Sequence, residues 1–158
     1  MAAVLFFCLP ALLFPQTETS SKISADEQLF LTIKAVVSPA RLSRGQEGKV
    51  ILNISPREGI LVNSQPSFTV EFDPSEEIVF PKNFFSATDL EIGISEQDGM
   101  NYLDLEEPIE IPFAVNMEAA RGSHILEGKV KFFAFSKKEG AVVKTAARFQ
   151  ISFSTRGS

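Results

Sequence analysis

Any catalytic chemistry in this chain would depend on a single histidine. His124 is the sole histidine among 158 residues, and no serine lies in the G-x-S-x-G turn that presents a catalytic nucleophile. A Ser-His-Asp site needs a nucleophile, a base and an orienting acid within hydrogen-bond reach of one another. Since His124 directly follows Gly122 and Ser123, we interpret it as an ordinary turn or strand-start residue.

Acidic side chains gather in two stretches that raise the question of metal binding or glycoside hydrolysis. Neither stretch has the D-x-D-x-D-G spacing of a calcium-binding loop, and hydrolysis of a sugar bond needs two carboxylates at a fixed separation across a cleft. No glycine-rich phosphate loop accompanies them. We therefore interpret these carboxylates as solvated loop charge and predict no metal and no cofactor. They are Asp73, Glu76 and Glu77, followed by Glu96, Asp98, Asp104, Glu106 and Glu107.

The length, composition and charge of the chain limit its class. A chain of 158 residues with 44% hydrophobic residues is long enough for one domain with a packed core. The formal net charge of -5 leaves no broad cationic surface for nucleic acid, and it disfavours adsorption to anionic lipid. We therefore expect a single globular domain that binds no nucleic acid.

The first 25 residues have the character of an export signal. Residues 1–14 form an uncharged apolar run that is interrupted at Pro10 and is short for a membrane-spanning helix. We predict a signal peptide or disordered leader over 1–25, a mature domain over 26–158 without a stable membrane span, and a periplasmic or secreted location. The only cysteine, Cys8, lies within the leader. The mature chain therefore has no thiol for a disulfide, a cysteine-ligated zinc site or thiol catalysis.

Apolar residues recur with a period of two through most of the remaining sequence, which is typical of half-buried β-strands. No segment of ten residues has the spacing of an amphipathic helix. Seven or eight short strands in about 130 residues are typical of an antiparallel sandwich, so we predict an all-β, immunoglobulin-like β-sandwich. The alternating segments are 29–37, 49–54, 68–72, 90–94, 109–115, 130–134 and 143–153.

Two local signals add detail to this fold. Pro112 lies within the segment 109–115 and has no N–H for a ladder hydrogen bond, so we expect it at an open strand edge. The polar segment from Ser136 to Gly140 predicts a hairpin between the last two strands, since glycine readily adopts the positive φ of a tight reversal.

Two of the β segments together resemble a known family. The stretches GKVILNISPREGILVNSQPSFTVEF (48–72) and GKVKFFAFSKKEGAVVKTAARFQISF (128–153) resemble the N-terminal periplasmic domain of DsbD-type thiol:disulfide interchange proteins. The resemblance extends over residues 37–153. Members of that family carry two cysteines on the closing hairpin, separated by five residues. On that spacing, the cysteine positions fall at Phe135 and Ala141.

The resemblance implies a hairpin without redox chemistry. Thiol-disulfide exchange requires a thiolate nucleophile and a second, resolving cysteine, and Phe135 and Ala141 supply neither. We expect a domain that is not an enzyme and that acts by docking, with Phe133 and Phe135 as aromatic anchors and Lys137 and Lys138 at their polar rim. Alternatively, Phe135 fills the space beneath a loop next to Ala141.

Three functional hypotheses follow from the sequence. The first is an exported, non-catalytic protein-interaction module whose partner is a thioredoxin-like or other envelope protein. The second is an accessory domain of a thiol-disulfide interchange system that holds a substrate or a redox partner. The third is a ligand-binding or carbohydrate-binding sandwich, which predicts a concave surface lined by aromatic residues.

Overall fold

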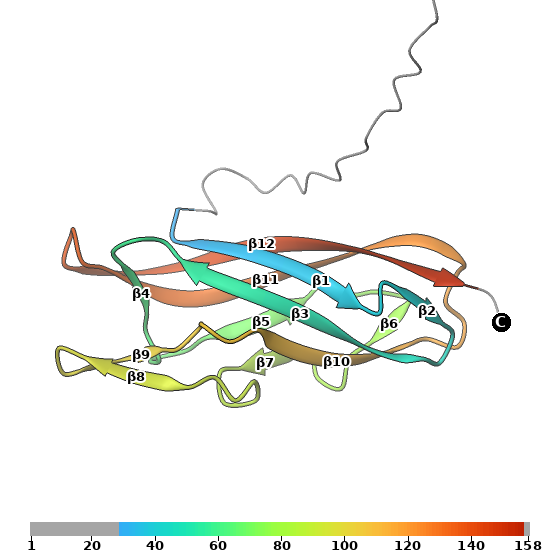
Figure 1. The fold of residues 1–158 in the computed structure, drawn as a ribbon, viewed down its shortest axis with the longest axis horizontal. Helices are drawn as coiled ribbons and strands as arrows, with labels where there is room; N and C mark the ends of the chain where they lie inside the picture. Colours follow the sequence, from blue (N-terminus) through green and yellow to red (C-terminus); the bar gives the residue numbers. More distant parts are fainter. Residues whose placement is uncertain (1–28, 157–158) are drawn as a thin grey trace, which may run out of the picture.

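The computed structural model describes residues 29–156, and these form an all-β structure without a helix. The leader predicted over 1–25, with its Cys8, lies outside the described residues, as do positions 26–28 and 157–158. Two main sheets form the immunoglobulin-like β-sandwich that the sequence predicts (Figure 1). Residues 29–156 therefore contain no membrane-spanning helix.

The first sheet has four strands in the order β1-β3-β10-β6, and every pair in it is antiparallel. Strand β3, one of the two inner strands, is the longest of the four, and it pairs with β1 along the whole of β1. The strands are β1 (Leu31–Ser38), β3 (Glu47–Pro56), β10 (Ile109–Val115) and β6 (Ile78–Val79).

The second sheet has the order β2-β12-β11-β5-β7, and β4 also pairs with β11. All pairs are antiparallel except β2 with β12. A separate hairpin of β8 and β9 is joined to the segment after β4 by a bridge between Asn63 and Tyr102. The strands are β2 (Arg41–Ser43), β4 (Ile60–Val62), β5 (Thr69–Phe72), β7 (Phe84–Ser86), β8 (Ile94–Gln97), β9 (Met100–Leu103), β11 (Gly122–Ser136) and β12 (Ala141–Arg156).

Phenylalanine rings join the two sheets within the core. Phe72 of β5 stacks on Phe80 with ring centroids 4.1 Å apart, and it meets Phe149 of β12 edge-on at 5.8 Å. Phe80 in turn contacts Phe113 of β10, in the first sheet, at 5.9 Å. Such aromatic pairs contribute about 0.5–1.5 kcal/mol each beyond the burial of their area. This chain of rings therefore stabilises the packing of one sheet on the other.

The strand predicted over 90–94 is wrong. The Leu90 N–H donates to the Ser86 carbonyl at 3.1 Å, the Ile92 N–H donates to the Ala87 carbonyl at 3.0 Å, and Glu91 has a φ of 54°. These bonds close turns, and β8 begins only at Ile94. Leu90 and Ile92 therefore lie in a turn and not in a β-ladder, although their alternation is typical of a strand.

Asp89 explains this turn. Its carboxylate accepts hydrogen bonds from the N–H and the hydroxyl of Ser86, both at 2.9 Å, and it also pairs with the Lys82 ammonium. The hydrogen bond from Lys82, followed by those from Ser86, lowers the pKa of Asp89 to about 2. A side chain that accepts a hydrogen bond from a backbone N–H three residues away in this way favours a turn over an extended strand.

The predicted edge position of Pro112 is confirmed. The Val115 N–H donates to the Gln46 carbonyl and the Val115 carbonyl accepts from the Gly45 N–H, both at 2.9 Å, on the β3 side of β10. Because successive residues of a strand direct their backbone groups to alternate sides, the Pro112 nitrogen faces away from β3. On that side β6 pairs only with Ala114 and Val115. No described strand therefore lies beside Pro112 to accept the hydrogen bond that its backbone nitrogen cannot donate.

Candidate protein-binding surface

The longest element of the fold is the closing hairpin, which consists of β11, β12 and the turn 137–140. Its register runs from the pair Gly122 and Thr155 to the pair Ser136 and Ala141 without a bulge. Gly140 at the turn has a φ of 62°, which agrees with the hairpin predicted from the sequence. The turn end of this hairpin reaches one extreme of the long axis of the molecule (Figure 1).

The two faces of the hairpin differ in character. Paired residues of antiparallel strands lie on the same face, and Phe132 and Ala134 of the inner face are buried in the core. On the outer face Phe133 lies opposite Lys144 and Phe135 lies opposite Val142. Both phenylalanines are half-buried, whereas Val142 is 51% exposed. Phe133 and Phe135 therefore lie on the face opposite Phe132, where the sequence placed them.

The outer-face rings have identifiable neighbours. The Lys144 ammonium lies 6.0 Å from the centroid of the Phe133 ring, which is the outer limit of a cation–π contact. The Phe135 ring lies 6.4 Å from the ring of Tyr102, a buried residue of β9, and Phe135 is in register with Leu61 of β4. Phe135 is thus flanked by β4 and β9 on one side and accessible on the other.

The register separates the two positions that the resemblance assigned to redox cysteines. Phe135 lies opposite Val142, and Ala141 lies opposite Ser136. A shift of one residue along a strand moves a side chain to the other face of the sheet, so Phe135 and Ala141 point to opposite faces. A disulfide needs two Cβ atoms about 3.5–4.5 Å apart. These two positions therefore share the end of the hairpin but lack the facing geometry of a disulfide pair.

Basic side chains surround the outer-face rings. Glu71 of β5 binds the ammonium groups of Lys131 at 2.8 Å and Lys129 at 3.5 Å. The pKa of Glu71 is lowered, mainly by the hydrogen bond from Lys131. Burial raises this pKa by a smaller amount. Arg148 lies 3.7 Å from Asp73. Part of this positive charge is therefore compensated within the sheet.

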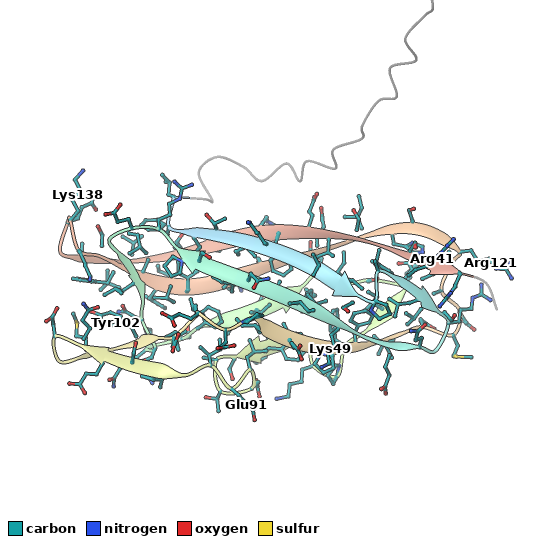
Figure 2. All side chains as sticks on the ribbon, in the orientation of Figure 1. Arg41, Lys49, Glu91, Tyr102, Arg121 and Lys138 are labelled. Atoms are coloured by element: carbon teal, nitrogen blue, oxygen red, sulfur yellow. The ribbon has the colours of Figure 1, made fainter. Side chains whose placement is uncertain are left out.

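The turn of the hairpin presents two further lysines. The Lys137 N–H donates to the Gly59 carbonyl at 2.9 Å, the Gly140 N–H donates to the Ser136 carbonyl at 2.8 Å, and the Glu139 N–H donates to the Ser136 hydroxyl at 3.3 Å. These bonds fix the turn, and the side chains of Lys137 and Lys138 are exposed. Lys138 extends from the end of the molecule (Figure 2). Neither lysine makes an ion pair with a described residue.

We refer to the set of outer-face and turn residues as the hairpin surface. It combines two half-buried aromatic rings, an exposed valine and a basic margin, which is the mixture that protein interfaces use. The sequence predicted the rings and the turn lysines. It missed Val142 and Lys144, which can be found only once the register of β12 against β11 is known. The hairpin surface comprises Phe133, Phe135, Lys137, Lys138, Val142 and Lys144.

His124 lies at the opposite end of the closing hairpin and has structural contacts. Its Nε2 atom lies 2.8 Å from both the Ala120 carbonyl oxygen and the Thr155 hydroxyl, and its Nδ1 atom lies 3.7 Å from a Glu77 carboxylate oxygen. Its ring also packs on Phe153 with centroids 5.2 Å apart. His124 therefore joins the start of β11 to the end of β12, and of the two readings, turn or strand start, the structure has the strand start.

The acidic stretches do not converge on a common point. Asp73 pairs with Arg148, Glu77 approaches His124, and the Asp104 carboxylate accepts the N–H of Glu106 at 3.1 Å. Across residues 29–156, no group of three or more histidine, cysteine, aspartate or glutamate side chains could hold a metal ion. Their geometry thus gives no support to a metal centre in the described part of the chain.

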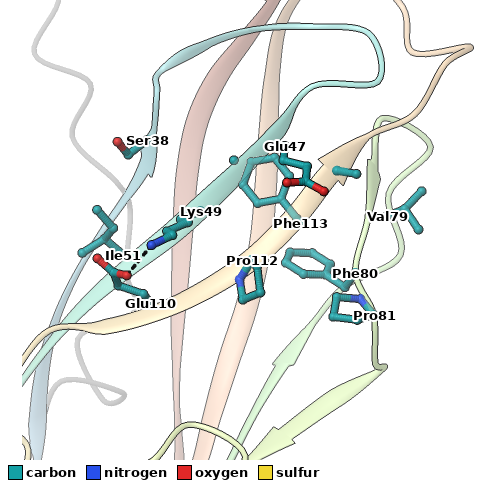
Figure 3. A pocket seen from close by; sticks show the side chains of 12 residues that line it. Ser38, Glu47, Lys49, Ile51, Val79, Phe80, Pro81, Glu110, Pro112 and Phe113 are labelled. Atoms are coloured by element: carbon teal, nitrogen blue, oxygen red, sulfur yellow. Dashed lines mark hydrogen bonds and ion pairs between the residues drawn. The ribbon is translucent and has the colours of Figure 1, made fainter.

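A shallow groove of about 800 Å³ lies on the outer face of the first sheet (Figure 3). Pro112, Val79 and Pro81 form its apolar margin, and the Lys49 ammonium binds the Glu110 carboxylate at 2.7 Å beside it. This groove was not predicted from the sequence, although Pro112 was a signal for the open edge that bounds it. The rings along it are Phe113, which is buried, and Phe80, which is half-buried and packed against Phe113. The groove is therefore concave and has one half-buried ring, and it does not support the carbohydrate hypothesis better than the protein-binding one.

Comparison with known proteins finds similar structures but no family. No protein-family model matches the sequence, and no curated protein sequence matches it either. Among solved structures, the chain is similar to a cohesin module from a family 33 glycoside hydrolase of Clostridium perfringens, with 12% identity, a TM-score of 0.48, and coverage of 82% of this chain and 97% of that module.

Two other solved structures are similar at lower TM-scores. A major pilin subunit of Bacillus cereus has 8% identity, a TM-score of 0.43, and coverage of 81% of this chain and 40% of the pilin. A type I cohesin–dockerin complex from Clostridium thermocellum has 12% identity, a TM-score of 0.39, and coverage of 79% and 99%. Since these TM-scores are below 0.5, no conclusion about this chain is drawn from the similarities.

Proposed function

We propose that this chain is an exported, non-catalytic protein-interaction module that binds its partner through the hairpin surface. The observation that carries the proposal is the half-buried pair of Phe133 and Phe135 next to the exposed Val142, on the face of the closing hairpin that points away from the core. Exposed apolar groups framed by charged ones mark interaction sites more often than isolated surface residues do. The lysines of the turn supply the polar rim.

We further propose that the module is redox-inert. The single cysteine of the chain is Cys8, so residues 29–156 hold no thiolate to attack a disulfide and no second cysteine to resolve an intermediate. A partner from a thiol-disulfide system would therefore be held by contact and not by electron exchange. Export rests on the apolar leader, and attachment of a reporter enzyme to that leader would test it by the compartment in which the reporter is active.

Site-specific photo-cross-linking tests the binding surface. A benzophenone side chain would replace Val142, which is 51% exposed, or Val36 of β1, which is 53% exposed on the first sheet. We expect Val142 to give a defined cross-link to an envelope protein and Val36 to give none. Cross-links of equal yield from both positions, or from neither, would contradict the proposal.

The second hypothesis, an accessory role beside a redox protein, restricts the partner to one class of protein. It requires the protein cross-linked at Val142 to be thioredoxin-like or a substrate of such a protein. A purified thioredoxin-like envelope protein should then bind the chain, and the double variant Phe133→Ser/Val142→Asp should weaken that binding by at least about tenfold, as loss of an interface anchor does. Binding that is unaffected by this variant would exclude the hairpin surface as the site.

A further inference from the structure

The ionisable residues of this chain are separated along the sequence. Between residues 83 and 120 there are nine acidic residues and no lysine or arginine, whereas residues 121–156 contain eight lysines and arginines and only two acidic residues. The acidic stretch includes the β8–β9 hairpin, and the basic stretch is the closing hairpin. The nine acidic residues are Asp89, Glu91, Glu96, Asp98, Asp104, Glu106, Glu107, Glu110 and Glu118.

The structure brings one part of each stretch to the same end of the molecule. The turns of the β8–β9 hairpin and of the closing hairpin both point to the left end of the long axis (Figure 1). β4 lies between them, since Ile60 pairs with Ser136 and Asn63 forms a bridge with Tyr102. Tyr102 packs on Phe135 at 6.4 Å and joins the two hairpins directly. One end of the domain thus presents a turn with two lysines and Glu139, which is basic on balance, beside an acidic turn with Glu96 and Asp98.

The two turns also expose apolar side chains. On the acidic side, Met100 is 42% exposed and Ile94 is 63% exposed, and Glu96 and Asp98 are exposed between them in the sequence. On the basic side, Val142 is 51% exposed near Lys137 and Lys138. Charge alone gives weak contacts at a solvated surface, so the apolar groups are needed for a stable interface.

We propose that a second copy of this chain docks end to end on the first, with the basic turn of each copy against the acidic turn of the other. This inference rests on the proposed function, because it uses the same hairpin surface and takes a second copy of this chain as the partner. Since both turns lie at the same end, one patch is complementary to itself after a twofold rotation. Such a contact is isologous and closes as a dimer.

Electrostatics give this dimer a recognisable signature. Two Lys137–Lys138 turns meet two Glu96–Asp98 turns, and each contact is exposed to solvent. The Debye length falls from roughly 30 Å at 0.01 M to roughly 3 Å at 1 M ionic strength. Association should therefore weaken as salt is raised, and reversal of the charges on either turn should convert attraction to repulsion at both contacts.

Sedimentation velocity of the purified full chain tests the inference with a complementary pair of variants. In about 20 mM salt the wild type should form a dimer as its concentration rises, and in about 500 mM salt it should dissociate more readily. Lys137→Glu/Lys138→Glu alone and Glu96→Lys/Asp98→Lys alone should each associate at least about tenfold more weakly. An equimolar mixture of the two should regain a dimer that contains one chain of each. The control Arg41→Glu/Arg121→Glu, which reverses two exposed charges at the opposite end of the molecule (Figure 2), should associate as the wild type does.

Any of three results would overturn the inference. The wild type could stay monomeric at every concentration in low salt, the mixture of variants could stay monomeric, or the chain could grow into open assemblies of three or more copies. Circular dichroism verifies that each variant keeps its β-structure. A wild-type monomer that still cross-links a different protein through Val142 would remove this inference and leave the proposed function standing. A chain that dimerises but gives no cross-link from Val142 to a different protein would keep this inference and remove the proposed binding of an envelope protein.

Discussion

Phe135 lies directly opposite Val142 on the outer face of the closing hairpin. This pairing places an aromatic ring and an exposed aliphatic side chain side by side, and it moves Ala141 to the other face. The Phe133 carbonyl accepts the N–H of Asn63 at 2.8 Å, so Phe133 directs its backbone groups away from β12. By alternation, Phe135 and Val142 form a non-hydrogen-bonded pair, in which the side chains approach most closely.

Engineered cysteines would test this register. In a Cys8→Ser background, Phe135→Cys/Val142→Cys should form an intramolecular disulfide under mild oxidation, because facing cysteines in such a pair have Cβ atoms within bonding range. Phe135→Cys/Ala141→Cys should keep two free thiols, since its side chains point to opposite faces. Thiol titration and a mobility shift on reduction would measure both. Equal oxidation of the two variants would show that the register is different.

Gly128 is expected to be intolerant of any side chain. A Cβ atom at this position would lie 2.5 Å from the Phe149 ring and 2.8 Å from the Glu71 carbonyl oxygen. Gly128→Ala should therefore lower the free energy of unfolding by about 1–3 kcal/mol, the usual cost of overpacking. Gly93→Ala is the control, because its nearest atom would be 3.6 Å away. Urea unfolding measures both, and equal losses in the two variants would contradict the crowding at Gly128.

Glu71 should make the stability of the domain depend on pH. Its hydrogen bond from Lys131 lowers its pKa in the folded state below the ordinary value of 4.5. The stabilisation is therefore present above that ordinary pKa and is lost as the pH falls through the folded-state pKa. Glu71→Gln should be less stable than the wild type at neutral pH, by less than about 1 kcal/mol for a partly exposed pair.

The difference between Glu71→Gln and the wild type should disappear on acidification, when both side chains are neutral. Thermal unfolding from neutral pH down to well below the ordinary pKa would follow it. The control is Glu139→Gln in the exposed turn, which makes no ion pair with a described residue. A difference for Glu71→Gln that persists unchanged in acid would argue against the ion pairs with Lys131 and Lys129.

Tyr102 should hold the β8–β9 hairpin against the closing hairpin. The residue is buried and its ring lies 6.4 Å from the ring of Phe135. Tyr102→Ala should cost about 3 kcal/mol, as removal of a buried aromatic ring does, and should increase amide hydrogen exchange over residues 94–103. Met100→Ala, at a position that is 42% exposed, should leave that exchange nearly unchanged. Faster exchange in both variants alike would assign the stability of β8–β9 to another contact.

Much of the fold could be predicted from local patterns. The inward positions of β11 and β12 follow from their period of two, the turn at Gly140 follows from its sequence, and the edge at Pro112 follows from a missing N–H. Each of these signals acts within a few residues. The segment 90–94 shows where such reasoning fails, because the same alternation occurs there in a turn that Asp89 stabilises through Ser86.

The binding surface could be predicted only in part. The sequence identified Phe133, Phe135 and the turn lysines, but it placed Phe135 beside Ala141. Register across a hairpin depends on the number of residues in the turn and on which distant strands pack against it, here β4 at Leu61 and β9 at Tyr102. The opposite charges at one end of the molecule likewise come from hairpins that are separate in the sequence and adjacent in the fold. Local patterns set the strands and their inward faces, whereas long-range packing set which side chains meet, because cross-strand contacts join residues far apart in the chain.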